Sequence, residues 1–61
     1  MMGPQIVSAL RPGTRVKTNF SYEDVLENTQ GAVVYDNKPF CFVIWDDGRF
    51  LPVPTKILIR I

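Results

Sequence analysis

The fold is decided by the stretch Val43-Ile44-Trp45-Asp46-Asp47-Gly48-Arg49-Phe50-Leu51, in which an apolar run ends at an aspartate-glycine pair and a second apolar run begins. An Asp-Gly pair between two such runs is the strongest short-range signal for a β-hairpin. The stretch therefore predicts a small all-β architecture. We also expect the Trp45 indole to lie exposed near the rim of the fold, beside two carboxylates.

The length and composition of the chain limit its class. With 61 residues, of which 46% are hydrophobic and 21% charged, it fits a single globular domain over residues 1–61 and is too apolar for a disordered tail. A domain of this size buries only about 60% of the surface that its unfolded chain exposes. A homodimer would add burial and stays an option.

Cysteine and histidine usage excludes several chemistries. The chain has one cysteine, Cys41, and no histidine, which leaves no internal disulfide, no histidine-based catalytic site and no structural zinc site. Cys41 lies between two phenylalanines and is expected to be a small core residue. The sequence contains no phosphate-binding glycine loop, nucleophile motif or metal-ligand cluster. We therefore predict no catalytic residue, no cofactor and no metal, and a protein that is not an enzyme.

No segment of the sequence predicts a membrane partner. The first five residues carry no basic side chain, and the apolar piece 6–10 is too short for the core of a signal peptide. No apolar run approaches the roughly 20 residues that span a bilayer. A cytoplasmic location is the default expectation.

Five short strands are expected from the alternation of apolar and polar residues and from the turn residues between them. They cover residues 14–18, 32–35, 40–45, 49–51 and 57–61. Residues 6–10 show a weaker strand pattern. Pro52 and Pro54 are expected to end the fourth strand, because proline cannot donate to a β-ladder. The longest interruption, 19–30, is expected to hold a short helical turn capped by Ser21.

The expected strand at 40–45 is apolar on both faces. Two sets of side chains alternate along it: Phe40, Phe42 and Ile44 on one face, and Cys41, Val43 and Trp45 on the other. A strand of this kind is either buried on two sides or leaves one face for a partner. The alternation itself leaves both alternatives open.

The order of the motifs points to a known family. A Pro12-Gly13-x-x-Val16 opening is followed by a long loop, a Gly31-Ala32-Val33 strand, the Val43-x-Trp45-Asp46-Asp47-Gly48 hairpin, a short turn and a closing strand around Leu58. Residues 10–61 thereby resemble the SH3-like small β-barrels of the Tudor and KOW kind, although the turn after Tyr35 lacks the glycine that many of them carry. The resemblance implies a five-stranded SH3-like barrel, closed into a roll, with one longer loop after the first strand.

Aromatic and arginine side chains make the first set of candidate site residues, because these residue types dominate the energy of protein interfaces. Together with a net charge of only +1, they predict a protein-interaction module, a small regulatory or accessory factor that binds a larger macromolecular machine. The candidate partner-binding residues are Trp45, Tyr35, Phe50, Arg49 and Asp46. The resemblance to Tudor domains implies a further use of Trp45 with Tyr22 or Phe20, as an aromatic cage for methylated lysine or arginine.

A second hypothesis is nucleic-acid binding, which the resemblance to KOW domains also implies. Arg15 and Lys17 share the outer face of the first expected strand, and Arg11 and Arg49 extend them into a basic stripe. Trp45 or Tyr22 would stack on a base. Against this, six acidic residues offset the seven basic ones, and a solvated surface explains the stripe equally well.

The last expected strand is a third interaction site. Its apolar side chains occupy both faces, with the isoleucines at 57, 59 and 61 on one of them. An uncovered edge of this kind tends to pair with another chain. We therefore predict a dimer contact or an edge strand at Ile57, Leu58, Ile59 and Ile61.

Overall fold

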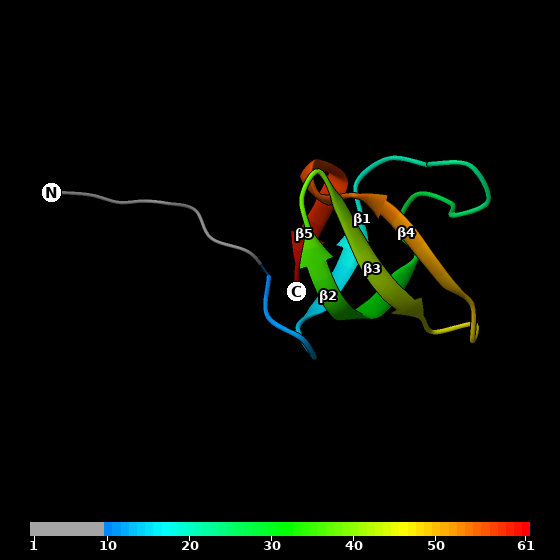
Figure 1. Cartoon of the computed structure of the whole chain (residues 1–61). Coiled ribbons are helices and arrows are strands. Elements are labelled where there is room, and N and C mark those ends of the chain that lie inside the picture. Colours follow the sequence, from blue (N-terminus) through cyan, green and yellow to red (C-terminus); the bar gives the residue numbers. More distant parts are fainter. Residues whose placement is uncertain (1–9) are drawn as a thin grey trace, which may run out of the picture.

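The computed structural model describes residues 10–61, and the weak strand pattern at 6–9 lies outside them. Five strands and one short 3-10 helix follow each other along the chain (Figure 1). They are β1 (Arg15–Thr18), β2 (Gln30–Asn37), β3 (Phe40–Trp45), β4 (Phe50–Pro54), η1 (Thr55–Ile57) and β5 (Leu58–Arg60). The prediction of an all-β fold with five strands is confirmed.

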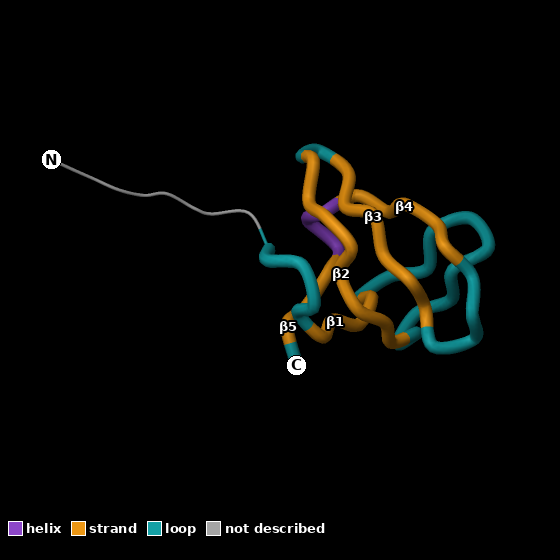
Figure 2. The backbone as a smooth tube through the Cα atoms, turned by 60° about the horizontal axis from the view of Figure 1, so that its bottom comes forward, coloured by secondary structure: helices purple, strands orange, loops and turns teal. Residues whose placement is uncertain are grey.

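The strands form one antiparallel sheet in the order β4-β3-β2-β1-β5. Consecutive strands from β1 to β4 are neighbours, and β5 returns to pair with β1. The sheet is strongly curled, because η1 alone connects β4 at one edge with β5 at the other (Figure 2). Within residues 10–61 these two edges are not hydrogen-bonded to each other, so the sheet is not closed and the expectation of a closed roll is corrected.

The hairpin between β3 and β4 forms where the Asp-Gly pair predicts it. The Trp45 N–H donates to the Arg49 carbonyl at 2.8 Å, and the Gly48 N–H donates to the Trp45 carbonyl at 2.8 Å. Gly48 has a φ of 95°, a left-handed conformation that glycine adopts without steric cost. The turn is therefore a three-residue loop with glycine at its last position, a common hairpin connection.

The two prolines do not end β4, which corrects the prediction from their sequence positions. Hydrogen bonds to β3 come from alternate residues: the Arg49 carbonyl accepts from Trp45, and the Thr55 N–H donates to the Pro39 carbonyl at 2.9 Å. Pro52 and Pro54 occupy the other positions, where a missing N–H faces the free edge of the sheet. Proline is tolerated there because no ladder bond is lost.

The segment between β1 and β2 holds no helical turn, contrary to expectation. Tyr22 and Val25 instead exchange backbone hydrogen bonds of 2.8 and 2.9 Å, and Glu23 has a φ of 52°, which no α-helix accepts. The Ser21 hydroxyl accepts a hydrogen bond from the Glu27 N–H at 3.0 Å. Burial of Val25, which is 1% exposed, outweighs the local preference for a helical turn.

A buried threonine holds the base of this loop. The Thr18 hydroxyl donates to the Leu26 carbonyl at 2.8 Å and accepts from the Thr29 N–H at 3.2 Å. Thr18 has no exposed surface, so both hydrogen bonds offset the cost of burying its hydroxyl.

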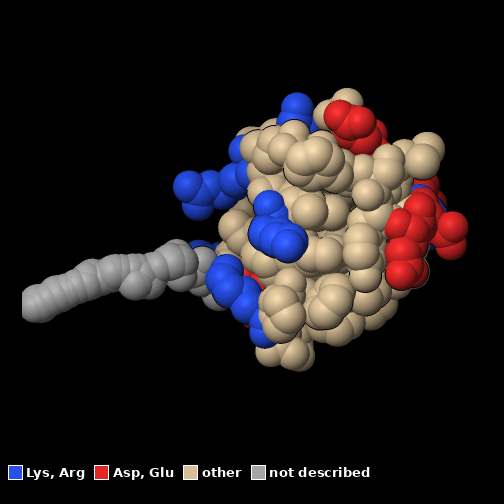
Figure 3. Space-filling model, turned by 90° about the horizontal axis from the view of Figure 1, so that it is seen from above, with Lys and Arg blue, Asp and Glu red and all other residues tan. Residues whose placement is uncertain are grey.

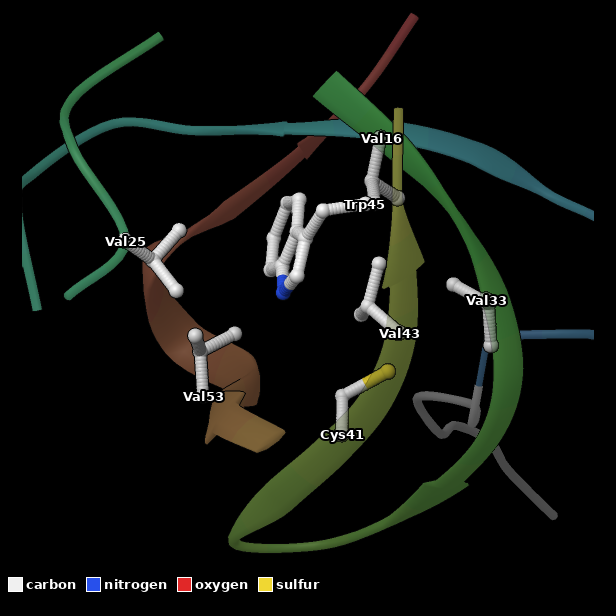
Figure 4. Close-up of a cluster of buried hydrophobic side chains, with 7 residues drawn as sticks. All are labelled: Val16, Val25, Val33, Cys41, Val43, Trp45 and Val53. Atoms are coloured by element: carbon white, nitrogen blue, oxygen red, sulfur yellow. The ribbon is translucent and has the colours of Figure 1, made fainter. Parts of the chain in front are cut away.

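The core lies inside the curl of the sheet (Figure 4). It consists of Val16, Val25, Val33, Cys41, Val43, Trp45 and Val53. Cys41 is a core residue as predicted, and burial, followed by the nearby Asp36 carboxylate, raises the pKa of its thiol to about 11.

Trp45 is the centre of this core, and the expectation that its indole lies exposed at the rim is wrong. The residue is 1% exposed, and its indole N–H donates to the Leu51 carbonyl at 3.1 Å. Small valines line most of the interior, so the one large indole fills the remaining volume. A Cβ on Gly31 would approach the ring to 2.9 Å and the Ile44 carbonyl oxygen to 2.6 Å, which explains why glycine faces Trp45 across the ladder.

Asp36, near the end of β2, connects three parts of the chain by hydrogen bonds. Its carboxylate accepts hydrogen bonds from the Leu10 N–H at 2.9 Å, the Thr55 hydroxyl at 2.7 Å and the Lys38 ammonium at 3.2 Å. Burial of the carboxylate would raise its pKa, but the three donors outweigh burial and hold the pKa below its ordinary value. Asp36 thereby fixes η1 against the turn between β2 and β3.

Candidate protein-interaction surface

The outer surface of β2, β3 and β4 carries a continuous group of apolar side chains, which we call the outer apolar face. Two cross-strand rows build it, since Tyr35 pairs with Phe42 and Ile44 pairs with Phe50. Three of its members are about half exposed: Phe50 at 55%, Tyr35 at 50% and Ile44 at 49%. The outer apolar face consists of Val34, Tyr35, Phe42, Ile44 and Phe50.

A β-bulge shapes this face. The register between β2 and β3 shifts between Val33 and Tyr35, so that Val33 lies in the core while both Val34 and Tyr35 are exposed. An extra residue in one strand re-aims the neighbouring side chains. As a result Val34 and Tyr35 line one shallow hollow together with Phe42 and Phe50.

The aromatic rings of the face contact one another. The Tyr35 and Phe42 ring centroids are 5.4 Å apart at an interplanar angle of 87°, an edge-to-face pair. Phe42 and Phe50 are tilted by 36° at 6.0 Å. Such pairs hold their rings in place, so the face presents a largely preformed apolar surface.

An ion pair borders the outer apolar face on the side of β1. The Arg15 guanidinium donates to both carboxylate oxygens of Asp46, at 2.9 and 2.7 Å. This hydrogen bonding lowers the pKa of Asp46. The predicted partner-binding carboxylate and one predicted nucleic-acid-binding cation therefore bind each other.

Arg49, a member of the predicted basic stripe, is engaged in contacts within the chain. Its side chain donates to the Asp47 carboxylate at 2.9 Å and to the Asp24 carbonyl at 2.8 Å, which joins the hairpin turn to the loop between β1 and β2. The Arg49 backbone N–H, and then its side chain, lower the pKa of Asp47. Arg49 is thus a bridge within the chain.

The structure brings together only part of the predicted partner-binding set. Tyr35 and Phe50 share the outer apolar face, whereas Trp45 lies on the opposite side of the sheet. The aromatic cage implied for Trp45 with Tyr22 or Phe20 is not formed, because the indole is buried. Sequence reasoning missed Val34, Phe42 and Ile44, although the alternation along β3 is a signal for the last two.

In the view of Figure 3, most of the visible lysine and arginine side chains lie on the left and most of the visible aspartate and glutamate side chains on the right. Among residues 10–61, four cations make no ion pair with a carboxylate: Arg11, Lys17, Lys56 and Arg60. Tyr22, a predicted stacking residue, packs partly against the core. Of the residues predicted to bind nucleic acid, Arg11 and Lys17 therefore make no ion pair with a carboxylate within residues 10–61, whereas Arg15 binds Asp46.

Over residues 10–61, no three histidine, cysteine, aspartate or glutamate side chains gather closely enough to hold a metal ion. In the same range no helix has the length and apolar character needed to cross a membrane.

Comparison with known proteins adds no relative. No protein-family model matches the chain, no curated protein matches its sequence, and no solved structure matches its fold. Functional inference therefore depends on the geometry described above.

Proposed function

We propose that this protein is a non-enzymatic interaction module, a small regulatory or accessory factor, that binds a protein partner through the outer apolar face. The observation that carries the proposal is the contiguity of five outward-facing apolar side chains on three neighbouring strands, of which four are exposed and Phe42 is partly buried. Soluble monomers rarely leave such a surface uncovered unless it binds something.

The distribution of aromatic residues supports this proposal. The chain has four phenylalanines and two tyrosines, yet the buried core contains neither type and is built from valine, cysteine and one tryptophan. A chain that needed aromatic side chains only for stability would place them inside, where burial contributes most. Four of these six residues, Phe20, Tyr35, Phe40 and Phe50, are exposed, which favours a role in recognition.

We further propose that the scaffold is an SH3-like small barrel. The long loop after β1, the β3–β4 hairpin and the short η1 before the closing strand β5 agree with the motif order from which the resemblance came. The strand order, in which β5 returns to pair with β1, is compatible with such a barrel. On this scaffold β2, β3 and β4 present their outer side chains on one curved surface.

The proposal is tested by comparing capture of partners by the wild-type chain and by the double variant Tyr35→Ser/Phe50→Ser. Both changes remove exposed apolar surface and leave the core intact, so the variant should stay folded. We expect the double variant to lose the partner that wild type captures from cell extract. After identification by mass spectrometry, the purified partner should bind wild type at least about tenfold more tightly in calorimetry, since central aromatic anchors contribute most of an interface.

Phe20→Ser is the matched control. Phe20 is 61% exposed on the loop between β1 and β2, outside the outer apolar face. The variant Phe20→Ser should therefore bind the purified partner as tightly as wild type does. Equal loss of binding in the control and in the double variant, or full binding by the double variant, contradicts the proposal.

A second candidate function is nucleic-acid binding, favoured by four cations that make no ion pair with a carboxylate within residues 10–61, Arg11, Lys17, Lys56 and Arg60. Salt distinguishes it from the first. Phosphate contacts make affinity fall steeply with salt concentration, whereas an apolar interface is nearly insensitive to it. A steep salt slope that survives Tyr35→Ser/Phe50→Ser favours this second function.

A further inference from the structure

The two edges of the sheet differ in their capacity to accept another strand. At the β4 edge, the positions that face outward include Pro52 and Pro54, which have no N–H to offer. Prolines at such positions are a common way to block strand addition. Any strand that joins this sheet must therefore do so at β5.

The free edge of β5 keeps its hydrogen-bonding groups. Toward β1, the Ile57 carbonyl accepts from the Asn19 N–H at 2.7 Å, and the Ile61 N–H donates to the Arg15 carbonyl at 3.0 Å. The intervening residues Leu58 and Arg60 therefore point their backbone groups outward. The Leu58 N–H is used by the Thr55 carbonyl within η1, which leaves the Leu58 carbonyl and both backbone groups of Arg60 for a partner.

A groove adjoins the free edge of β5. Leu58, the first residue of β5, is one of the residues that line it. The other lining residues come from η1, from the end of β4, from the turn between β2 and β3 and from the first residue of β3. They are Lys38, Pro39, Phe40, Pro54, Thr55 and Lys56. Apolar side chains dominate the lining, and no carboxylate belongs to it among the described residues.

Charge decides which occupant fits. Lys56 and Arg60 flank the edge, and Lys17 lies on the adjacent strand opposite Ile59. None of the three makes an ion pair within residues 10–61. A second copy joined at β5 about a two-fold axis would bring the same cations together, which is unfavourable.

We propose that the free edge of β5 binds an extended, acidic segment of a partner protein by strand addition. Main-chain hydrogen bonds to Leu58 and Arg60 would hold the segment, alternate apolar side chains would enter the groove, and its carboxylates would meet Lys56 and Arg60. This surface shares none of the residues that define the outer apolar face, although Phe40 of the groove lies on the same side of β3 as Phe42 and Ile44. The proposed function and this inference can therefore fail independently.

The test uses a defined probe, the capped peptide Val-Glu-Val-Glu-Val-Glu-Val, and its counterpart with lysine in place of glutamate. Each is titrated into the ¹⁵N-labelled full chain and followed by NMR. We expect the glutamate peptide to shift the amide signals of β5, η1 and the groove, and the lysine peptide to shift none. Arg60→Gln and Lys56→Gln should each weaken binding by about two- to fivefold, the size expected of one exposed charge pair.

Arg60→Pro separates strand addition from charge alone. It removes the outward N–H without touching a bond to β1, and it should weaken binding by a further factor of about ten relative to Arg60→Gln, from the lost hydrogen bond and the clash of the ring with an added strand. Arg11→Gln is the control for a cation outside the site, and it should bind as wild type does. Retention of the β1–β5 amide signals confirms that each variant is folded.

Three results would overturn the inference. Equal affinity of Arg60→Pro and Arg60→Gln would exclude strand addition. Binding of the lysine peptide, or a stable dimer of the free chain in native mass spectrometry that Arg60→Pro dissolves, would assign another occupant to the edge. Tighter binding of a seven-nucleotide single-stranded DNA than of the glutamate peptide, at the same residues, would make this surface a nucleic-acid site.

Discussion

The two faces of β3 are both apolar, but only one of them is buried. Cys41, Val43 and Trp45 are buried in the core, whereas Phe42 and Ile44 on the other face belong to the exposed outer apolar face. The sheet curls toward the first set, and the valines of β1, β2 and β4 pack against it. The difference shows that hydrophobicity does not decide which face is internal, because the direction of curl decides it.

The two faces should respond differently to truncation. Trp45→Ala removes the largest core side chain and should destabilise the fold by about 3–5 kcal/mol, which suffices to unfold many small domains. Phe50→Ser removes an exposed ring and should change stability by only about 0.5 kcal/mol. Urea denaturation followed by far-UV circular dichroism measures both. Comparable losses in the two variants would mean that both faces contribute to one core.

Gly31 tests how tightly the inner face is packed. Gly31→Ala places a Cβ within 2.6 Å of the Ile44 carbonyl oxygen and 2.9 Å of the Trp45 ring. Such overpacking should cost about 1–3 kcal/mol, measured as a lower thermal midpoint. Ala32→Gly, at the adjacent and less buried position, is the comparison. A variant Gly31→Ala with unchanged stability would indicate that the indole has room to move.

Asp36 tests the hydrogen bonds that connect η1 and the start of the described chain to β2. Its pKa is lowered in the fold, so its ionised form stabilises the folded state fully above the pKa of the unfolded carboxyl, about 3.9. That stabilisation is lost as the pH falls through the lower pKa of the folded state. Asp36→Asn should cost about 1 kcal/mol at pH 7, and the difference from wild type should shrink as the pH falls below about 4.

The control for this prediction is Asp46→Asn, which removes an exposed carboxylate with a lowered pKa. Its pH dependence should be weaker, because solvent screens the Arg15–Asp46 pair. The measurement is the free energy of unfolding by urea between pH 2.5 and 7. A constant difference between wild type and Asp36→Asn over this range would contradict the role given to Asp36.

Several features were predictable from local sequence. The Asp47-Gly48 pair placed the β3–β4 turn correctly, and the two alternating sets of β3 are the two sets that the structure separates. The prediction that β4 ends at Pro52 was wrong, because only alternate residues of β4 donate to β3. Pro52 stands at one of the other positions, so its missing N–H removes no ladder bond. The helical turn expected near Ser21 failed because Val25 enters the core, a contact that local pattern does not reveal.

The candidate site was predictable only in part. Tyr35 and Phe50 were identified from residue type, and they meet through cross-strand pairing with Phe42 and Ile44. The sequence predicts Asp46 as a partner-binding residue, whereas in the structure it binds Arg15, which is 31 residues away in sequence. Such long-range pairs become visible only when strand order and register are known.

Residue order was sufficient to establish that this chain forms strands, where the hairpin turn at Asp47-Gly48 lies and which side chains of β3 share a face. These properties follow from the period of two along a strand and from the conformational freedom of glycine in turns, both of which are local. The burial of Trp45, the tolerance of Pro52 and Pro54, and the open edge at β5 were decided by the way the sheet curls and pairs. They depend on contacts between residues distant in sequence, for which neighbouring residues carry no information.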